Sequence, residues 1–149
     1  MGWGHLHSLL LAVLIVLLVW AGIEDVRQRT IANAKTIAIA LLAPAWWWAS
    51  GMAVWPDMAI QLAAALIVFA LFVGVFAMGW MGGGDVKLIG ALALWLSPAL
   101  LAWMLVAMSA IGGLLTLAML IDRRFARREG PVEVPYGVAI ACAALLALS

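Results

Sequence analysis

The chain contains few charged residues and has long stretches without any. Of its 149 residues, 10% are Asp, Glu, Lys or Arg and 68% are hydrophobic, and the mean hydropathy is +1.20. Soluble domains are about 25% charged and about 45–50% apolar, so this composition excludes a soluble globule with an ordinary polar surface. We therefore predict an all-α, multi-pass protein that has the lipid bilayer as its solvent.

Cysteine is almost absent as well. Cys142 is the only one, which excludes an internal disulfide and a zinc site built from several cysteines. Its neighbours Ala141 and Ala143 favour a small, buried side chain at this position. The net charge of +1 gives no bulk electrostatic argument for a nucleic-acid partner. We predict no nucleic-acid partner, no metal site and no cofactor.

The first seven residues contain no Lys or Arg. A cleavable signal peptide has a basic segment before its apolar core. The first apolar stretch is therefore predicted to be a retained membrane span that begins outside the cytoplasm.

Six apolar segments are predicted to be transmembrane helices, although a span normally needs about 20 residues. The fourth segment has 11 residues and would reach only about 16 Å, so either its helix continues through Ser97–Pro98 or the bilayer is thinned. Most tryptophans lie near segment ends, as interfacial anchors do. The segments are Ser8–Ile23, Thr36–Val54, Met58–Gly79, Val86–Leu96, Pro98–Ile121 and Pro135–Leu148.

The positive charges support this count. Six spans with both termini outside the cytoplasm place every Lys and Arg in three cytoplasmic loops, as the positive-inside rule requires. We treat residues 1–149 as a single membrane-embedded domain. The basic residues are Arg27, Arg29, Lys35, Lys87, Arg123, Arg124, Arg127 and Arg128.

Two aspartates then lie on the same side of the membrane, with Asp25 closing the first span and Asp85 opening the fourth. A carboxylate at the rim of a bilayer is costly and is a functional candidate by default. Gly82, Gly83 and Gly84 would allow unwound backbone that receives an extended peptide. The simpler alternatives are a glycine turn with Asp85 as helix N-cap, and an Asp25 that only pairs with a neighbouring arginine.

Together, the two carboxyl groups suit activation of water by a general acid and a general base. Like charges placed close together do not both ionise cheaply, so one of the pair keeps a proton. Asp25 is expected at a helix C-terminus and Asp85 at a helix N-terminus, where the dipole favours negative charge. This argument predicts that Asp85 is the more readily ionised member.

Other polar residues have weaker signals. Lys87 either holds a carboxylate ionised, contacts a substrate or only sets the topology. Asn33 either forms a hydrogen bond near the site or caps the second helix. The acidic loop residues suit a basic partner, or are simply solvated charges; they are Glu24, Glu129 and Glu133.

Three strings, in this order, resemble those of the type IV prepilin peptidases. Asp25 to Asn33 (DVRQRTIAN) is similar to the first aspartate motif of that family, and Gly82 to Leu88 (GGGDVKL) is similar to the second, the GxGD motif. Pro135-Tyr136-Gly137 precedes a last helix in the same way. The resemblance covers nearly the whole chain.

The resemblance implies a membrane-embedded aspartic endopeptidase of the bacterial cytoplasmic (inner) membrane. Its substrates would be prepilin or pseudopilin proteins, whose short basic leader is cut off after a glycine at the cytoplasmic face. The catalytic residues would be Asp25 and Asp85. Longer members have a cytoplasmic segment with paired cysteines that is linked to N-methylation. This chain looks like the short form found with Flp/Tad-type pili, for which we expect no methylation.

The residues alone leave other readings open. A non-enzymatic membrane scaffold or an ion-coupled transporter would use the two aspartates for packing or for binding protons or cations such as Mg²⁺. A presenilin-like protease shares the GxGD string, but would have its first aspartate inside a helix and more spans. The sequence leaves the individual substrate and the oligomeric state open.

Overall fold

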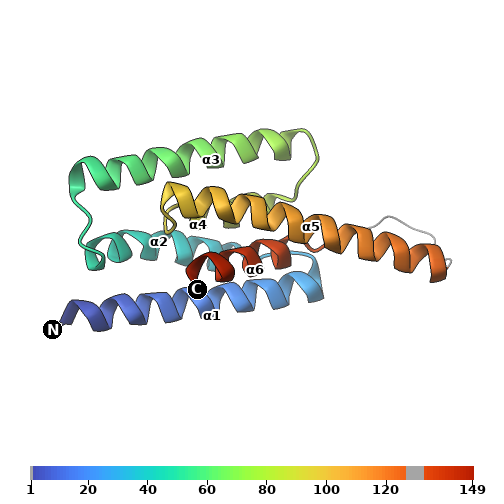
Figure 1. Ribbon diagram of the computed structural model, residues 1–149, viewed down its shortest axis with the longest axis horizontal. Coiled ribbons are helices and arrows are strands. Elements are labelled where there is room, and N and C mark those ends of the chain that lie inside the picture. The colour runs from blue at the N-terminus through green and yellow to red at the C-terminus, as the bar shows by residue number, and fades with distance from the viewer. Residues whose placement is uncertain (1, 127–132) are drawn as a thin grey trace.

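The computed structural model describes residues 2–126 and 133–149, and within them the fold is entirely helical (Figure 1). The prediction of an all-α fold with six α-helices is confirmed. Three helices are long and apolar enough to cross a bilayer, while the count of six spans and the orientation stay predictions. The elements are α1 (Gly2–Gln28), α2 (Asn33–Ala49), η1 (Val54–Met58), α3 (Ala59–Ala77), α4 (Gly83–Ala93), α5 (Pro98–Ala126) and α6 (Tyr136–Leu148).

Two short helices form the centre of the bundle. Helix α4 lies against α2, α3 and α6, and α6 also packs on α1 and α5. Figure 1 shows α5 projecting beyond the other helices, at the end of the bundle where α1 ends. The start of α4, the start of α6 and the end of α1 lie at this same end of the molecule (Figure 1). The buried side of α4 consists of Val86, Leu88, Ile89, Ala91, Leu92 and Ala93.

The short length of α4 is accommodated by neighbouring side chains that cap its end. The last carbonyl groups of a helix have no partner within the helix. Gln61 Nε2 donates to the Ala93 carbonyl oxygen at 2.8 Å, and Trp47 Nε1 donates to that of Leu94 at 2.6 Å. Helix α4 ends before Ser97–Pro98, so the predicted extension through these residues is wrong. The helix stops inside the protein because its free carbonyl groups are bonded there.

The prediction that the tryptophans are interfacial anchors is wrong for Trp47 and Trp95, which are buried. Trp95 Nε1 donates to the Ile39 carbonyl oxygen at 2.8 Å, and a buried indole N–H normally has such a partner. Both side chains tie α2 to the end of α4. Other tryptophans are exposed, namely Trp20, Trp48, Trp55, Trp80 and Trp103.

The prediction for Cys142 is also wrong, because its side chain is exposed. Ala141 and Ala143, on either side, are buried. Helix α6 buries one face and exposes another, and an apolar sequence on all sides does not tell which face a residue takes.

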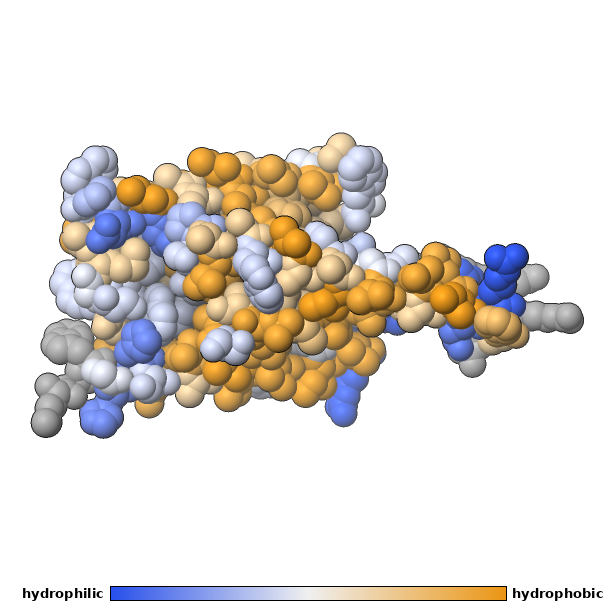
Figure 2. Space-filling model, in the orientation of Figure 1, coloured by the Kyte–Doolittle hydropathy of each residue, from blue (hydrophilic) through white to orange (hydrophobic). Residues whose placement is uncertain are grey.

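Apolar side chains cover the middle of the face shown in Figure 2, and the strongly hydrophilic ones gather toward the ends. The described basic residues lie where α1 and α5 end and where α2 and α4 begin, or in the loop between α1 and α2. They are Arg27, Arg29, Lys35, Lys87, Arg123 and Arg124. Arg127, Arg128 and Glu129 lie outside the described residues.

The capping of α4 makes Gln61 a test of the fold. Gln61 Nε2 also donates to the Leu96 carbonyl oxygen at 2.5 Å. Replacement of Gln61 by Leu keeps the size of the side chain and removes its hydrogen bonds to the carbonyl groups of Ala93 and Leu96. We expect the free energy of unfolding to fall by about 1–3 kcal/mol, measured by thermal or denaturant unfolding in detergent. Ser109→Ala is the control, since Ser109 is exposed and bonds only to its own helix. Equal stability of the two variants would contradict this account of α4.

Candidate active site

Asp25 and Asp85, which are far apart in the sequence, line the same cavity. Asp25 lies near the end of α1 and Asp85 in the first turn of α4. The cavity has a volume of about 620 Å³ and opens between these helices and the start of α6. Its other lining residues include Arg29, Asn33, Gly82, Gly83, Gly84, Glu133 and Tyr136.

The Asp25 side chain is 5% exposed, and its Oδ2 atom has no hydrogen-bond partner among the described residues. The backbone N–H groups of Gly137 and Val138, at the start of α6, face the same carboxyl group. Arg29 donates to the backbone carbonyl oxygen of Glu133 instead. The alternative in which Asp25 merely pairs with a neighbouring arginine is therefore wrong for the part of the chain described here, in which the one ion pair joins Lys35 to Glu24.

The glycines before Asp85 adopt two conformations. Gly82 is extended, with φ −72° and ψ 146°, and is the N-cap of α4, whereas Gly83 and Gly84 are already helical. The prediction of three unwound glycines is therefore wrong for two of them, and so is the alternative in which Asp85 is the N-cap. A Cβ atom on Gly84 would meet Cβ of Ile31 at 3.4 Å, an ordinary contact distance, so Gly84 lies directly against Ile31.

Burial raises the pKa of Asp85 to about 6, and the negative charge of Asp25 adds to the rise. The backbone N–H of Gly82 opposes these effects only in part. Asp85 belongs to the short α4, outside the three helices that are long enough to cross a bilayer. Burial and the neighbouring charge thus outweigh the dipole at the start of α4, which does not keep the pKa of Asp85 low. Which of the two aspartates ionises first stays a prediction.

Lys87 and Asn33 form a pair at the edge of the site. Lys87 Nζ donates to Asn33 Oδ1 at 3.0 Å. Asn33 lines the cavity of the two aspartates, whereas both residues line a neighbouring, mainly apolar cavity of about 370 Å³. Lys87 therefore bonds to Asn33 and to neither aspartate. Asn33 is the first residue of α2, and the N-cap is Ala32. The alternative in which Asn33 caps the second helix is therefore wrong.

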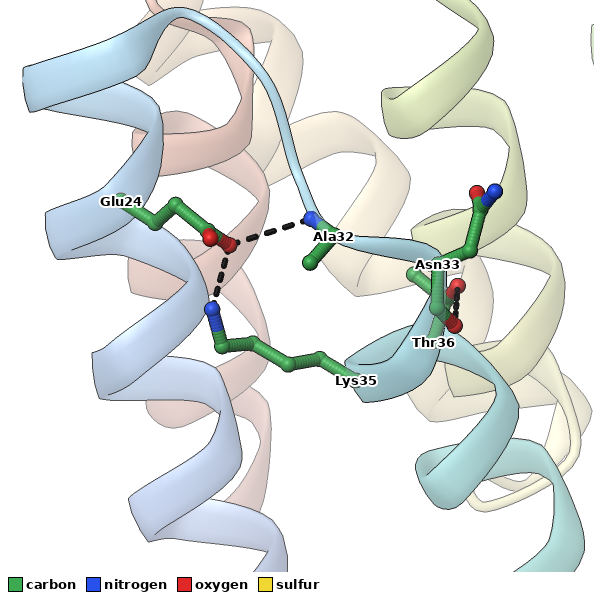
Figure 3. Close-up of polar contacts among 5 residues, drawn as sticks. All are labelled: Glu24, Ala32, Asn33, Lys35 and Thr36. Atoms are coloured by element: carbon green, nitrogen blue, oxygen red, sulfur yellow. Dashed lines mark hydrogen bonds and ion pairs between the residues drawn. The ribbon is translucent and has the colours of Figure 1, made fainter.

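A polar contact between α1 and α2 was missed at the sequence level (Figure 3). Glu24 forms an ion pair with Lys35, and it accepts a hydrogen bond from the backbone N–H of Ala32 at 3.1 Å. Lys35 is only 7% exposed, and its Nζ lies 4.6 Å from the Trp20 ring centroid. Glu24 is thus not a free loop charge. The sequence does contain a signal for this ion pair, because Glu24 and Lys35 carry opposite charges on either side of the short connection 29–32.

Comparison with known families identifies the chain. A sequence model described as the type IV leader peptidase family matches residues 12–117, which include both aspartates. The chain belongs to this family. The resemblance stated above is confirmed, while the Flp/Tad-type short form stays a prediction. Comparison with curated proteins and with solved structures gives no match.

Because it belongs to the leader peptidase family, the protein is a protease. This favours the peptidase hypothesis over a scaffold or a transporter. With three helices of spanning length, the protein is a multi-pass membrane protein.

The raised pKa of Asp85 predicts a titration that is visible without a substrate. In the folded protein the carboxyl group of Asp85 stays protonated up to a pH near 6, whereas an ordinary Asp has a pKa of about 3.9. Infrared spectroscopy of the reconstituted protein should show a carboxylic acid C=O band that is lost as the pH rises through about 6. The band should be missing from Asp85→Asn. A band that is already lost by about pH 4 would contradict the assignment.

Proposed function

We propose that the protein is an aspartic endopeptidase that removes the basic leader of prepilin-like proteins at the cytoplasmic face of a bacterial inner membrane. The observation that carries this proposal is the shared cavity of Asp25 and Asp85. The family supports the type of substrate, and two carboxyl groups on one cavity support the aspartic mechanism. Residues 1–149 would act as one membrane-embedded domain.

In the proposed reaction, Asp85 carries the shared proton and Asp25 is the general base. Asp25 takes a proton from water, whose oxygen attacks the carbonyl carbon of the scissile peptide bond, while Asp85 gives its proton to the carbonyl oxygen. Asp25 then protonates the leaving nitrogen, the C–N bond breaks, and Asp85 recovers its proton from the intermediate. The pair titrates as a unit, and this assignment follows the raised pKa of Asp85.

The charges that line the cavity are of both signs. Glu133 is exposed and lines it, whereas Glu24 is occupied by Lys35. Arg29 also lines the cavity and donates to the backbone of Glu133. A basic leader would be attracted by Glu133 and repelled by the Arg29 beside it, so these charges alone do not select an orientation of the leader.

Leader removal tests the function directly. The protein is co-expressed with a candidate prepilin, and processing is followed by the shift in electrophoretic mobility. Asp25→Asn and Asp85→Asn should each abolish processing, because an amide neither accepts the proton of water nor gives one to the carbonyl oxygen. Arg27→Ala should process normally, since Arg27 is exposed and does not line the cavity.

Membrane fractionation and thermal unfolding of each variant ensure that lost processing is not lost protein. Complete processing by either aspartate variant would overturn the proposed mechanism. Lack of processing by the wild-type protein with several prepilins would overturn the proposed substrate class.

A further inference from the structure

The carboxyl group of Asp25 fills the space that the side chain of residue 137 would need. A Cβ atom on Gly137 would lie 2.8 Å from both Cγ and Oδ2 of Asp25, and 2.9 Å from Cδ1 of Ile31. Real Cβ atoms do not make contacts this short. Any other residue at position 137 would therefore displace the carboxyl group, Ile31 or helix α6.

Ile31 touches both central helices where they begin. Its side chain is buried, with Cδ1 against Gly137 at the start of α6 and Cβ against Gly84 at the start of α4. Gly84 directly precedes Asp85 in the sequence. Ile31 thus lies between Gly137, which contacts the carboxyl group of Asp25, and Gly84, which precedes Asp85.

The position of Ile31 is itself fixed by polar contacts. Glu24 accepts a hydrogen bond from the N–H of Ala32, the next residue, and pairs with Lys35 in the first turn of α2 (Figure 3). Two residues before Ile31, Arg29 donates to the backbone of Glu133, close before α6. The connection between α1 and α2 is therefore held on both sides of Ile31.

We propose that Gly137 and Ile31 are positioning residues, which set the Asp25 carboxyl group relative to Asp85 by close packing. The backbone N–H groups of Gly137 and Val138 face the Asp25 carboxyl group, but its Oδ2 atom has no hydrogen-bond partner among the described residues. The surfaces of Gly137 and of Ile31 beside it therefore limit the rotation of the carboxyl group. The inference rests on the proposed function, because it assigns these residues to the reaction of the same two carboxyl groups.

The chain offers a matched pair of glycines for the test. Gly22 lies at the same contact between α1 and α6, and a Cβ atom there would meet Cβ of Ala141 at 3.5 Å, an ordinary distance. Purified Gly137→Ala and Gly22→Ala are compared with the wild type on one prepilin in detergent, by kcat, KM and thermal unfolding. A misplacement of about 1 Å can cost about 100-fold in rate. We expect kcat of Gly137→Ala to fall by about this factor with KM little changed, and Gly22→Ala to stay within about twofold of the wild type.

A second pair separates positioning from stability. Ile31→Ala removes the side chain that lies between Gly137 and Gly84, and adds no atom. Ile39→Ala truncates a fully buried isoleucine of α2 that does not line the cavity. Both should lower the unfolding temperature, because both leave a void. Only Ile31→Ala should lower kcat, by about tenfold or more, since only it frees the carboxyl group of Asp25.

The outcomes are distinct. Failure of the wild type to cleave would reject the proposed function. A cleaving wild type with normal kcat in Gly137→Ala would reject the positioning role. If Gly137→Ala does not insert into the membrane, the isoleucine pair decides, and equal kcat values for Ile31→Ala and Ile39→Ala would reject the proposal.

Discussion

Steric exclusion at position 137 is the constraint on which the geometry of the site depends. A Cβ atom on that residue would lie 2.8 Å from the Asp25 carboxyl group, so the end of α1 approaches the start of α6 more closely than a side chain at position 137 would permit without a shift. Ile31 transmits the same contact to the start of α4. Packing against two short helices therefore determines where both carboxyl groups of the site lie, with hydrogen bonds and ion pairs holding the surrounding connection.

The two short helices are packed against the long ones, and side chains complete the hydrogen bonds at the end of α4. Gln61 and Trp47 bond the carbonyl groups at the end of α4, leaving its first turn free to face the cavity. Helix α4 keeps Asp85 half-buried, and that burial raises its pKa to about 6.

The sequence predicted the helices well, because long apolar segments between charged loops leave few other folds. Helix order and charge also predicted that Asp25 and Asp85 lie on the same side of the membrane. Both line one cavity in the structure, while their orientation in the membrane stays a prediction. The contacts of individual residues were not predictable in the same way. Trp47 and Gln61 act on the end of another helix, and uniformly apolar helices carry no periodic signal for the face that packs. The motif ending in Gly137 was noticed, but its contact with Asp25 depends on how α6 packs on α1.

The central claim is that the carboxyl groups of Asp25 and Asp85 meet across one cavity within a single chain. A Cys142→Ser background removes the only cysteine, and Asp25→Cys with Asp85→Cys then places two thiols at the site. The membrane protein is treated with a bifunctional thiol reagent of short spacer and analysed by mass spectrometry. The account predicts one reagent bridging both positions within the same chain. Separate modification of each cysteine, or bridges only between chains, would contradict it.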